Sequence, residues 1–457
     1  MNAMSLNDRL PASNGQEPNL LREQFPYDRP PLIAFDGVEV PMDRPTDLFI
    51  TDTTFRDGQQ ARTPYTVGQI TALFDLLHRL SGPRGVIRQT EFFLYSDKDR
   101  QAVRACQERG YAFPEITAWI RAVAKDFQLV KEMGIRETGI LTSCSDYHIH
   151  LKLGMNRAQA MEQYLSVVRA ALAEGIRPRC HLEDVTRADV HGFVIPFVQQ
   201  LVRLSEESGI PVKVRLCDTM GYGVSYPGAA LPRSVPRLVH ALRTETGIAS
   251  AQLEWHGHND FYKVLTNAST AWLYGCSGVN GTLLGFGERT GNAPIEGLLF
   301  EYIGLTGDTS VDTRVVTEIA DYFERELGYA IPPMTPFVGK SFNVTAAGIH
   351  ADGIVKNEEI YNIFDTDKLL KRPLGILVTD KAGTAGVAHW INRYLGLSGE
   401  ARIDKRIPGV QALYEWVVGQ YEDGRTTSLA NEELEAAARR LMPEVFLSLR
   451  DEKFEPS

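Results

Sequence analysis

The sequence predicts a (β/α)8 TIM barrel followed by a mainly helical C-terminal appendage. Three observations lead to this prediction: eight short β-like runs between residues 46 and 305, amphipathic helices after most of them, and a first strand that runs into Arg56-Asp57-Gly58. A doubly wound sheet is the alternative, but its first strand is normally followed by a G-x-G-x-x-G turn. We therefore favour the barrel.

The predicted strands recur at the spacing of β/α units. They are residues 48–54, 86–93, 114–120, 136–142, 177–183, 211–217, 251–257 and 279–285. Two of the helices between them are well marked, because apolar residues recur at i, i+3, i+4 and i+7 in 66–80 and 157–173. Thr66 and Gln69 predict a capping box at the start of the first of these helices.

The pattern along the chain divides it into three segments. Residues 1–45 are rich in Pro, Asn and Asp and read as a tail and lead-in, and residues 46–308 carry the β/α alternation of the barrel. Residues 309–457 form the appendage, with a helix over 312–328 and a charged helical part over roughly 408–450. An appendage of this size is too large to be a simple tail.

Composition excludes several classes of protein. The 457 residues are 43% hydrophobic and 23% charged, which is ordinary for a soluble globular protein and not for a disordered or fibrous one. The net charge of -10 argues against nucleic-acid binding, and no run approaches 18 apolar residues, so no membrane span is expected. The five cysteines occur singly and the N-terminus is polar, which predicts a cytoplasmic protein without a disulfide framework.

The ends of the predicted strands carry an unusual number of polar residues, and His256-x-His258 is the most informative group. Residues i and i+2 of a strand point to the same side, so both imidazoles can converge on one ion. Asp57, at the end of the first strand, can supply a carboxylate, and Asn292 lies on a neighbouring strand end. We predict a divalent metal site, open to Mn, Mg, Co or Zn. The alternative is a pair of hydrogen-bonded histidines.

Three motifs, TDTTFRDGQQ, WHGHND and GFGERTGN, resemble those of the acyl-CoA-condensing metallo-barrels. This family includes isopropylmalate synthase, homocitrate synthase and Re-type citrate synthase, and the resemblance covers about residues 46–390. Hydroxymethylglutaryl-CoA lyase shares the barrel and the first motif. Its last loop carries a Cys, however, and residues 281–292 contain none, which favours the synthases.

The resemblance implies a role for each matching residue of the barrel. Asp57, His256 and His258 match the metal ligands, and Asn292 matches a residue close to the metal. Arg56 matches the arginine that faces the carbonyl oxygen of the oxo acid.

The remaining barrel matches surround the substrates. Glu183 matches a glutamate of the substrate pocket, with Arg187 as its partner. Thr219 matches the threonine that binds the carboxylate, and His148 matches a histidine near the second substrate. Gln60 and Glu91, at the ends of the first two strands, complete the substrate-binding set that we predict.

In the appendage, AAGIHADG followed by Tyr361 resembles a segment that the second subunit supplies in this family. The resemblance implies a homodimer with shared active sites and makes the appendage a lid and dimerisation region. His350 and Tyr361 are then candidates for proton transfer and lid contacts. Without the resemblance, the preferred interpretation is a histidine and a tyrosine packed inside the appendage.

The chain also departs from the common pattern of the family. Phe261-Tyr262-Lys263 follows Asp260, and His181 replaces a pocket serine. HNDFYKV and RQTEFFLYSDKDR look most like the Re-type citrate synthase branch, which has relatives acting on phosphorus-containing analogues of oxaloacetate.

The resemblance therefore implies a metal-dependent Claisen condensation of acetyl-CoA with a 2-oxo acid, followed by hydrolysis of the thioester. Oxaloacetate or an analogue is the favoured oxo acid. The alternatives are isopropylmalate or homocitrate synthase, a metal-dependent lyase or aldolase, and a non-catalytic binding barrel.

Overall fold

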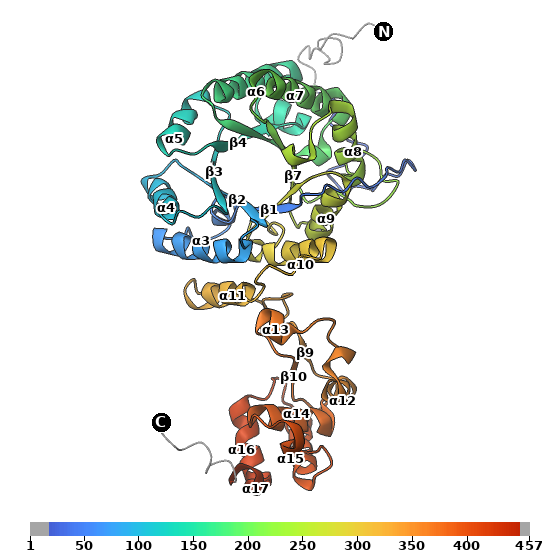
Figure 1. Ribbon diagram of the computed structural model, residues 1–457. Helices are drawn as coiled ribbons and strands as arrows, with labels where there is room; N and C mark the ends of the chain where they lie inside the picture. Colours follow the sequence, from blue (N-terminus) through green and yellow to red (C-terminus); the bar gives the residue numbers. More distant parts are fainter. Residues whose placement is uncertain (1–17, 448–457) are drawn as a thin grey trace. The chain divides into compact units, whose positions relative to one another are not determined.

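The computed structural model describes residues 18–447, and the chain divides into two compact units, Met1–Val315 and Val316–Ser457. The first unit is a closed barrel of eight parallel strands that pair in chain order, with β1 against β8 (Figure 1). The strands are β1 (Phe49–Asp52), β2 (Ile87–Phe92), β3 (Glu115–Ile120), β4 (Glu137–Ser143), β5 (Arg177–Glu183), β6 (Lys213–Asp218), β7 (Leu253–Gly257) and β8 (Gly278–Gly281). The predicted fold class is confirmed.

Helices surround this ring of strands on the outside (Figure 1). They are α2 (Asp57–Gln60), α3 (Val67–Ser81), α4 (Asp97–Gln107), α5 (Phe127–Glu132), α6 (Arg157–Ala173), α7 (Ile195–Ser208), α8 (Val235–Thr246), α9 (Val264–Tyr274) and α10 (Ile295–Thr306). Between residues 18 and 447, no helix is both long and apolar enough to cross a membrane. All five cysteines are buried free thiols.

Helix α3 shows how the sequence specifies these elements. The Thr66 hydroxyl accepts a hydrogen bond from the Gln69 backbone N–H at 3.2 Å, and the Gln69 side chain accepts one from the Thr66 N–H at 2.9 Å. The predicted capping box is therefore confirmed, and such a cap contributes about 1 kcal/mol. The apolar stripe, for example Leu73 and Leu77, is fully buried beneath the helix.

The last strand is shorter than predicted, and its early end shapes the mouth of the barrel. The sequence suggests a strand over 279–285, but β8 stops at Gly281 and the 3₁₀ turn η6 (Leu283–Gly285) follows. The Leu283 N–H donates to the Thr54 hydroxyl at 2.9 Å instead of continuing the ladder, and Leu284 adopts a φ of 55°. After this turn the chain continues as a loop to Asn292.

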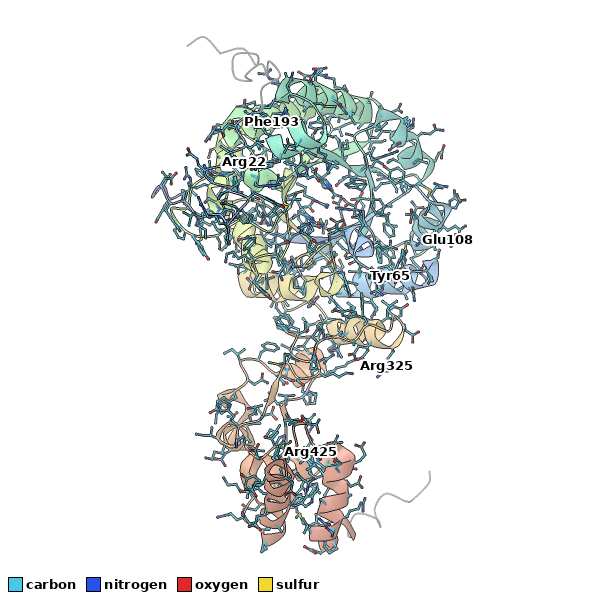
Figure 2. The ribbon with its side chains drawn as sticks, turned by 180° about the vertical axis from the view of Figure 1, so that it is seen from behind. Arg22, Tyr65, Glu108, Phe193, Arg325 and Arg425 are labelled. Atoms are coloured by element: carbon cyan, nitrogen blue, oxygen red, sulfur yellow. The ribbon has the colours of Figure 1, made fainter. Side chains whose placement is uncertain are left out.

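The interior of the barrel is filled with side chains, and charged groups are prominent among them (Figure 2). Arg179 and Arg215 are completely buried, and both contact the Glu91 carboxylate, at 2.6 and 3.1 Å. Arg215 also lies 2.8 Å from Glu254, and Arg179 lies 3.1 Å from Glu137. The carboxylates and guanidinium groups compensate one another in a core from which water is excluded.

The second unit is mainly helical, as predicted. Its elements are α11 (Val315–Arg325), which begins at the division, β9 (Val344–Thr345), α12 (Gly348–Lys356), α13 (Thr366–Leu370), β10 (Gly375–Ile376), α14 (Gly383–Tyr394), α15 (Pro408–Glu422), α16 (Asn431–Leu441) and α17 (Pro443–Leu447). The two short strands pair in parallel, and α14, α15 and α16 enclose an apolar core that includes Val387, Ile391 and Leu413.

Candidate active site

A cavity of about 370 Å³ lies at the carboxyl ends of the strands, where barrel enzymes place their active sites. Its lining residues come from the ends of all eight strands: Arg56, Asp57, Gln60, Phe93, Tyr95, Trp119, Arg121, Leu141, His181, Glu183, Cys217, Thr219, His256, His258 and Glu288. Seven of the predicted site residues are therefore brought together: Arg56, Asp57, Gln60, Glu183, Thr219, His256 and His258.

Two imidazoles and one carboxylate converge at the floor of this cavity. Strand β7 and the residue after it place His256 and His258 on the same side, with their Nε2 atoms 3.3 Å apart. The Asp57 Oδ2 lies 3.8 Å from the His256 Nε2, and one ligand atom from each of the three residues lies within 4.8 Å of the other two. All three side chains are buried, so the group has the ligands and the spacing of a metal centre.

Neighbouring amides hold two of these three ligands, His256 and Asp57, in place. The Asn280 Oδ1 lies 2.7 Å from the His256 Nδ1, and its Nδ2 donates to the Thr51 hydroxyl at 2.8 Å. This contact keeps the proton of His256 on Nδ1 and leaves the Nε2 lone pair facing the cavity. The Asn292 Nδ2 donates to the Asp57 Oδ2 at 2.6 Å, while its buried Oδ1 has no hydrogen-bond partner among residues 18–447. A cation at this point would satisfy the unpaired Asn292 oxygen.

The local electrostatics favour the ligand forms of these side chains. Burial lowers the pKa of His256 and of His258, so both imidazoles are neutral at physiological pH. Burial raises the pKa of Asp57, but the charge of Arg56 and the hydrogen bond from Asn292 favour the ionised form, and the net pKa of Asp57 is lowered. Two neutral imidazoles and one ionised carboxylate are the protonation states that a divalent cation requires.

Arg56 is held at the edge of the cavity by two carboxylates. Its Nε donates to the Glu91 Oε2 at 2.8 Å and its Nη1 to the Asp57 Oδ1 at 3.1 Å. Glu91 itself does not line the cavity, because its carboxylate also contacts Arg179 and Arg215 in the barrel interior. Direct contact of Glu91 with substrate stays a prediction, and its observed neighbours make it a support for Arg56.

Glu183 lies on the opposite wall at the end of β5. Its Oε2 lies 2.9 Å from the His148 Nδ1 and 3.1 Å from the Lys152 Nζ, and it also accepts a hydrogen bond from the Ser143 hydroxyl. Burial raises the pKa of Glu183, but the hydrogen bond and charge of His148, with the other two partners, lower it to about 2. His148 stands behind Glu183 and outside the cavity lining.

The pairing of Glu183 with Arg187 that the resemblance implies is not found. The Arg187 Nε donates to the Asp184 Oδ1 at 3.0 Å, and its guanidinium lies 4.2 Å from the centroid of the Tyr147 ring. The reason is local: Asp184, with a φ of 66°, presents a fully buried carboxylate three residues before Arg187. Lys152 supplies the cation that contacts Glu183 instead.

Thr219 is poised to donate to a ligand. Its hydroxyl accepts a hydrogen bond from the Asp184 backbone N–H at 2.8 Å, and its only described acceptor, the Cys217 carbonyl, is distant at 3.4 Å. The hydroxyl proton is therefore weakly engaged and available to an anionic group in the cavity.

Two lining residues that the sequence analysis missed lie at the end of the third strand. Trp119 is part of β3, and Arg121 comes directly after it, with its Nη2 3.2 Å from the Asp126 carboxylate. The rule that located the other strand-end residues also points to Arg121, since barrel sites collect the residues after each strand. Arg121 adds a second guanidinium to a cavity already lined by Arg56.

His181 occupies space that a glycine provides. A Cβ atom at Gly139, on the neighbouring strand β4, would lie only 2.6 Å from the His181 Nε2. Burial, then the charge of Arg215, lowers the pKa of His181 well below its usual value, so its imidazole is neutral. Gly139 and His181 therefore form a matched pair in the cavity wall.

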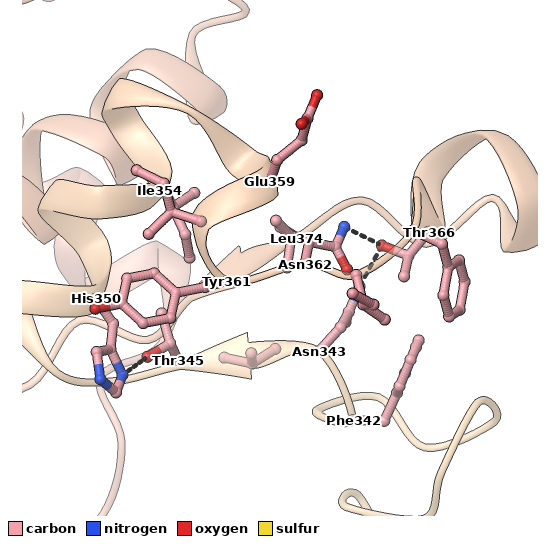
Figure 3. A pocket seen from close by; sticks show the side chains of 14 residues that line it. Phe342, Asn343, Thr345, His350, Ile354, Glu359, Tyr361, Asn362, Thr366 and Leu374 are labelled. Atoms are coloured by element: carbon pink, nitrogen blue, oxygen red, sulfur yellow. Dashed lines mark hydrogen bonds between the residues drawn. The ribbon is translucent and has the colours of Figure 1, made fainter.

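His350 and Tyr361 lie in the second unit, at a cavity of about 520 Å³ (Figure 3). Their ring centroids are 4.4 Å apart, and the His350 Nδ1 lies 3.2 Å from the Thr345 hydroxyl. Both side chains are exposed, which differs from the alternative in which they pack inside the appendage. Their roles in proton transfer and lid contacts stay predictions.

Comparison with known proteins agrees with this geometry. Residues 47–322 match the HMGL-like family. The chain is 60% identical over 433 residues to the citrate (Re)-synthase of Syntrophus aciditrophicus, covering 94% of this chain and 69% of that protein. It is 54% identical to the citrate (Re)-synthase of Clostridium kluyveri, covering 95% and 96%. It is 37% identical to the 2-phosphinomethylmalate synthase of Streptomyces hygroscopicus, covering 94% and 98%.

Proposed function

Because this chain belongs to the HMGL-like family, we propose that it is an acyltransferase that condenses acetyl-CoA with oxaloacetate and hydrolyses the product to citrate and free CoA. One observation carries the proposal: 54% identity extends over 96% of the length of a citrate (Re)-synthase. The identity thus includes the second unit as well as the barrel. A lyase or aldolase on the same barrel would have no use for hydrolysis of a thioester.

The metal-binding group supports this chemistry. Enzymes of this family depend on a divalent metal ion, and Asp57, His256 and His258 would hold one here. When bound, such an ion polarises the carbonyl of an oxo acid and makes its carbon electrophilic. A set of two nitrogen ligands and one oxygen ligand suits Mn, Co or Zn, and Mg remains in the proposal because availability often decides which ion is used.

Arg56 and Thr219 would act on the oxo acid itself. The guanidinium of Arg56 is fixed by Glu91 and Asp57, so its charge needs no reorganisation when negative charge develops on the carbonyl oxygen. A preorganised donor of this kind typically lowers the barrier by about 3 kcal/mol. Thr219 would donate its weakly engaged hydroxyl proton to the adjacent carboxylate.

The acetyl group must lose a methyl proton before the new carbon–carbon bond can form. We assign this proton transfer to His350, assisted by Tyr361, from the second unit of a partner subunit in a homodimer. Glu183 would organise the pocket: with its pKa lowered to about 2 it is ionised, and it cannot serve as a proton donor at neutral pH. Water then cleaves the thioester, which releases the CoA thiol and the new carboxylate.

The choice of oxaloacetate rests on the charges of the cavity. Oxaloacetate carries a second carboxylate, and Arg121 gives the cavity of about 370 Å³ a second guanidinium group besides that of Arg56, which we assign to the carbonyl oxygen. An isopropylmalate synthase, whose oxo acid ends in an apolar group, would not need the second one. Because the chain is also similar to a 2-phosphinomethylmalate synthase, the proposal includes analogues of oxaloacetate as alternative substrates.

A panel of oxo acids tests the function. The purified protein is incubated with acetyl-CoA, a divalent ion and either oxaloacetate, a phosphorus-containing analogue, 2-oxoisovalerate or 2-oxoglutarate, and free thiol is followed. We expect the fastest thiol release with oxaloacetate, and its loss with a chelator. Release that depends on no oxo acid would contradict the synthase, and faster release with 2-oxoisovalerate would contradict the substrate.

A further inference from the structure

The second unit contains another cavity, of about 460 Å³, beside the end of α12 and the 3₁₀ turn η7 (Glu358–Ile360). Its lining residues are Ile354, Val355, Lys356, Asn357, Glu358, Pro373, His389, Asn392, Arg393, Leu397 and Arg402. It shares only Ile354 with the cavity around His350. We propose that this cavity binds a small organic anion with a phosphate or carboxylate head and an apolar body.

Two arginines supply the charge for the head group. Neither Arg393 nor Arg402 forms an ion pair with any carboxylate of the described residues, and the Arg393 Nη1 donates to the Leu374 carbonyl. Lys356, which also lines the cavity, is in contrast paired with Asp352 at 2.7 Å. Glu358 is the single acidic residue in the lining, so the two arginines leave the cavity positively charged.

His389 adds a polar atom without a partner. Its Nε2 is buried and makes no hydrogen bond within the described part of the chain. Burial, and then the charges of Arg393 and Arg402, lower the pKa of His389 to about 4. The imidazole of His389 is therefore neutral at physiological pH. An oxyanion between the arginines would satisfy the two guanidinium groups and could accept the Nε2 proton.

The backbone that carries Arg402 is fixed without a bound ligand. The Asn392 Nδ2 donates to the Ile403 carbonyl at 3.0 Å, and its Oδ1 accepts from the Ile403 N–H at 2.6 Å. These two bonds fix the backbone next to Arg402. Ile354, Val355 and Leu397 add apolar surface to the lining, and the volume falls in the range of about 300–1,000 Å³ usual for small-molecule sites.

The position of the cavity suggests a consequence for activity. Residues 354–358 line it and also connect His350, on α12, to Tyr361, which follows η7. A ligand in the cavity would restrict the conformation of this connection and thus the placement of both side chains. This second step rests on the proposed function, whereas the binding site does not.

Calorimetric titration of the metal-loaded full chain tests the site with four probes: ADP, citrate, hexanoate and inorganic phosphate. Arg402→Gln removes the charge without touching any described partner, and Arg406→Gln is the matched control because Arg406 pairs with Asp404 outside the cavity. We expect one organic probe to bind once per chain and to lose about tenfold in affinity in Arg402→Gln but not in Arg406→Gln.

The four probes separate the sources of the head group. Tight binding of ADP indicates a phosphate head, tight binding of citrate or hexanoate indicates a carboxylate, and phosphate alone should bind weakly because it lacks the body. If no probe shows binding that depends on Arg402, the site is refuted.

The effect on activity is measured separately by thiol release. At a ligand concentration near the Kd of the unaltered protein, kcat should change in the unaltered protein and in Arg406→Gln, and change much less in Arg402→Gln. Arg402-dependent binding without any change in kcat would overturn the link to His350 and Tyr361. Absence of thiol release in every sample would refute the proposed function while the titration still decides the anion site.

Discussion

The two units of this protein bury very different interiors. The barrel encloses Glu91, Arg179 and Arg215, all nearly inaccessible to solvent, whereas the second unit encloses aliphatic side chains such as Val410 and Leu413. A charged interior is stable only while each charge keeps its partners, and an apolar interior depends on volume instead. In the barrel, Glu91 also accepts a hydrogen bond from Arg56. We therefore expect a substitution in this charged interior to reduce both stability and activity.

Breaking the charged interior should have the largest effect. In Arg215→Met, Glu91 and Glu254 each lose one of their buried cations, and removing one partner of a buried ion pair costs about 3–5 kcal/mol. We expect the free energy of unfolding, measured by urea denaturation, to fall by that amount and thiol release to fall with it. Lys131→Met, which removes an exposed pair with Glu174, is the control, with a loss below about 1 kcal/mol. Equal losses in both variants would contradict the comparison.

A cavity in the apolar interior should destabilise without affecting the metal site. Leu413 is fully buried among α14, α15 and α16, and Leu413→Ala removes about 3 kcal/mol by lost burial and the cavity left behind. We expect an earlier urea transition and unchanged metal content by mass spectrometry. Loss of metal from the folded variant would show that the barrel site depends on this core.

The strand-end residues of the barrel were predictable and its interior was not. His256-x-His258 follows from the two-residue period of a strand, and Arg121 follows from the same strand-end rule once β3 is included. Arg179 and Arg215, in contrast, lie 88 and 124 residues from Glu91 in the sequence. No local sequence pattern therefore predicts that they pair with it. The predicted Glu183–Arg187 pairing does not form because Asp184, three residues before Arg187, presents a buried carboxylate that binds the guanidinium instead.

Glu296 is a buried carboxyl of the barrel that forms no ion pair with any cation among residues 18–447. Burial raises its pKa to about 7, with the Leu284 N–H donating to it at 3.2 Å. Below about pH 4.5 both states are protonated; between about pH 4.5 and 7 only the folded state keeps the proton, so the free energy of unfolding falls as pH rises. Relative to the unaltered protein, Glu296→Gln should gain on the order of 3 kcal/mol across this interval, measured by urea denaturation at several pH values. A constant difference would contradict the assignment.

The smallest effect is expected for Asn280, and it tests how much a neutral hydrogen-bond partner contributes to metal affinity. Asn280 contacts His256 Nδ1 at 2.7 Å and carries no charge, so its loss disturbs the orientation of one ligand and leaves the ion pairs of the barrel intact. Removing such a supporting group typically lowers metal affinity by about 10–100-fold. We therefore expect Asn280→Ala to bind metal more weakly in a competition titration with a chelator, with little change in the urea transition of the metal-free protein. Asn280→Asp restores an acceptor for the Nδ1 proton and should recover part of the affinity. If Asn280→Ala kept full affinity, the tautomer of His256 would have to be fixed by burial alone, and the amide next to it would serve only the contact with Thr51.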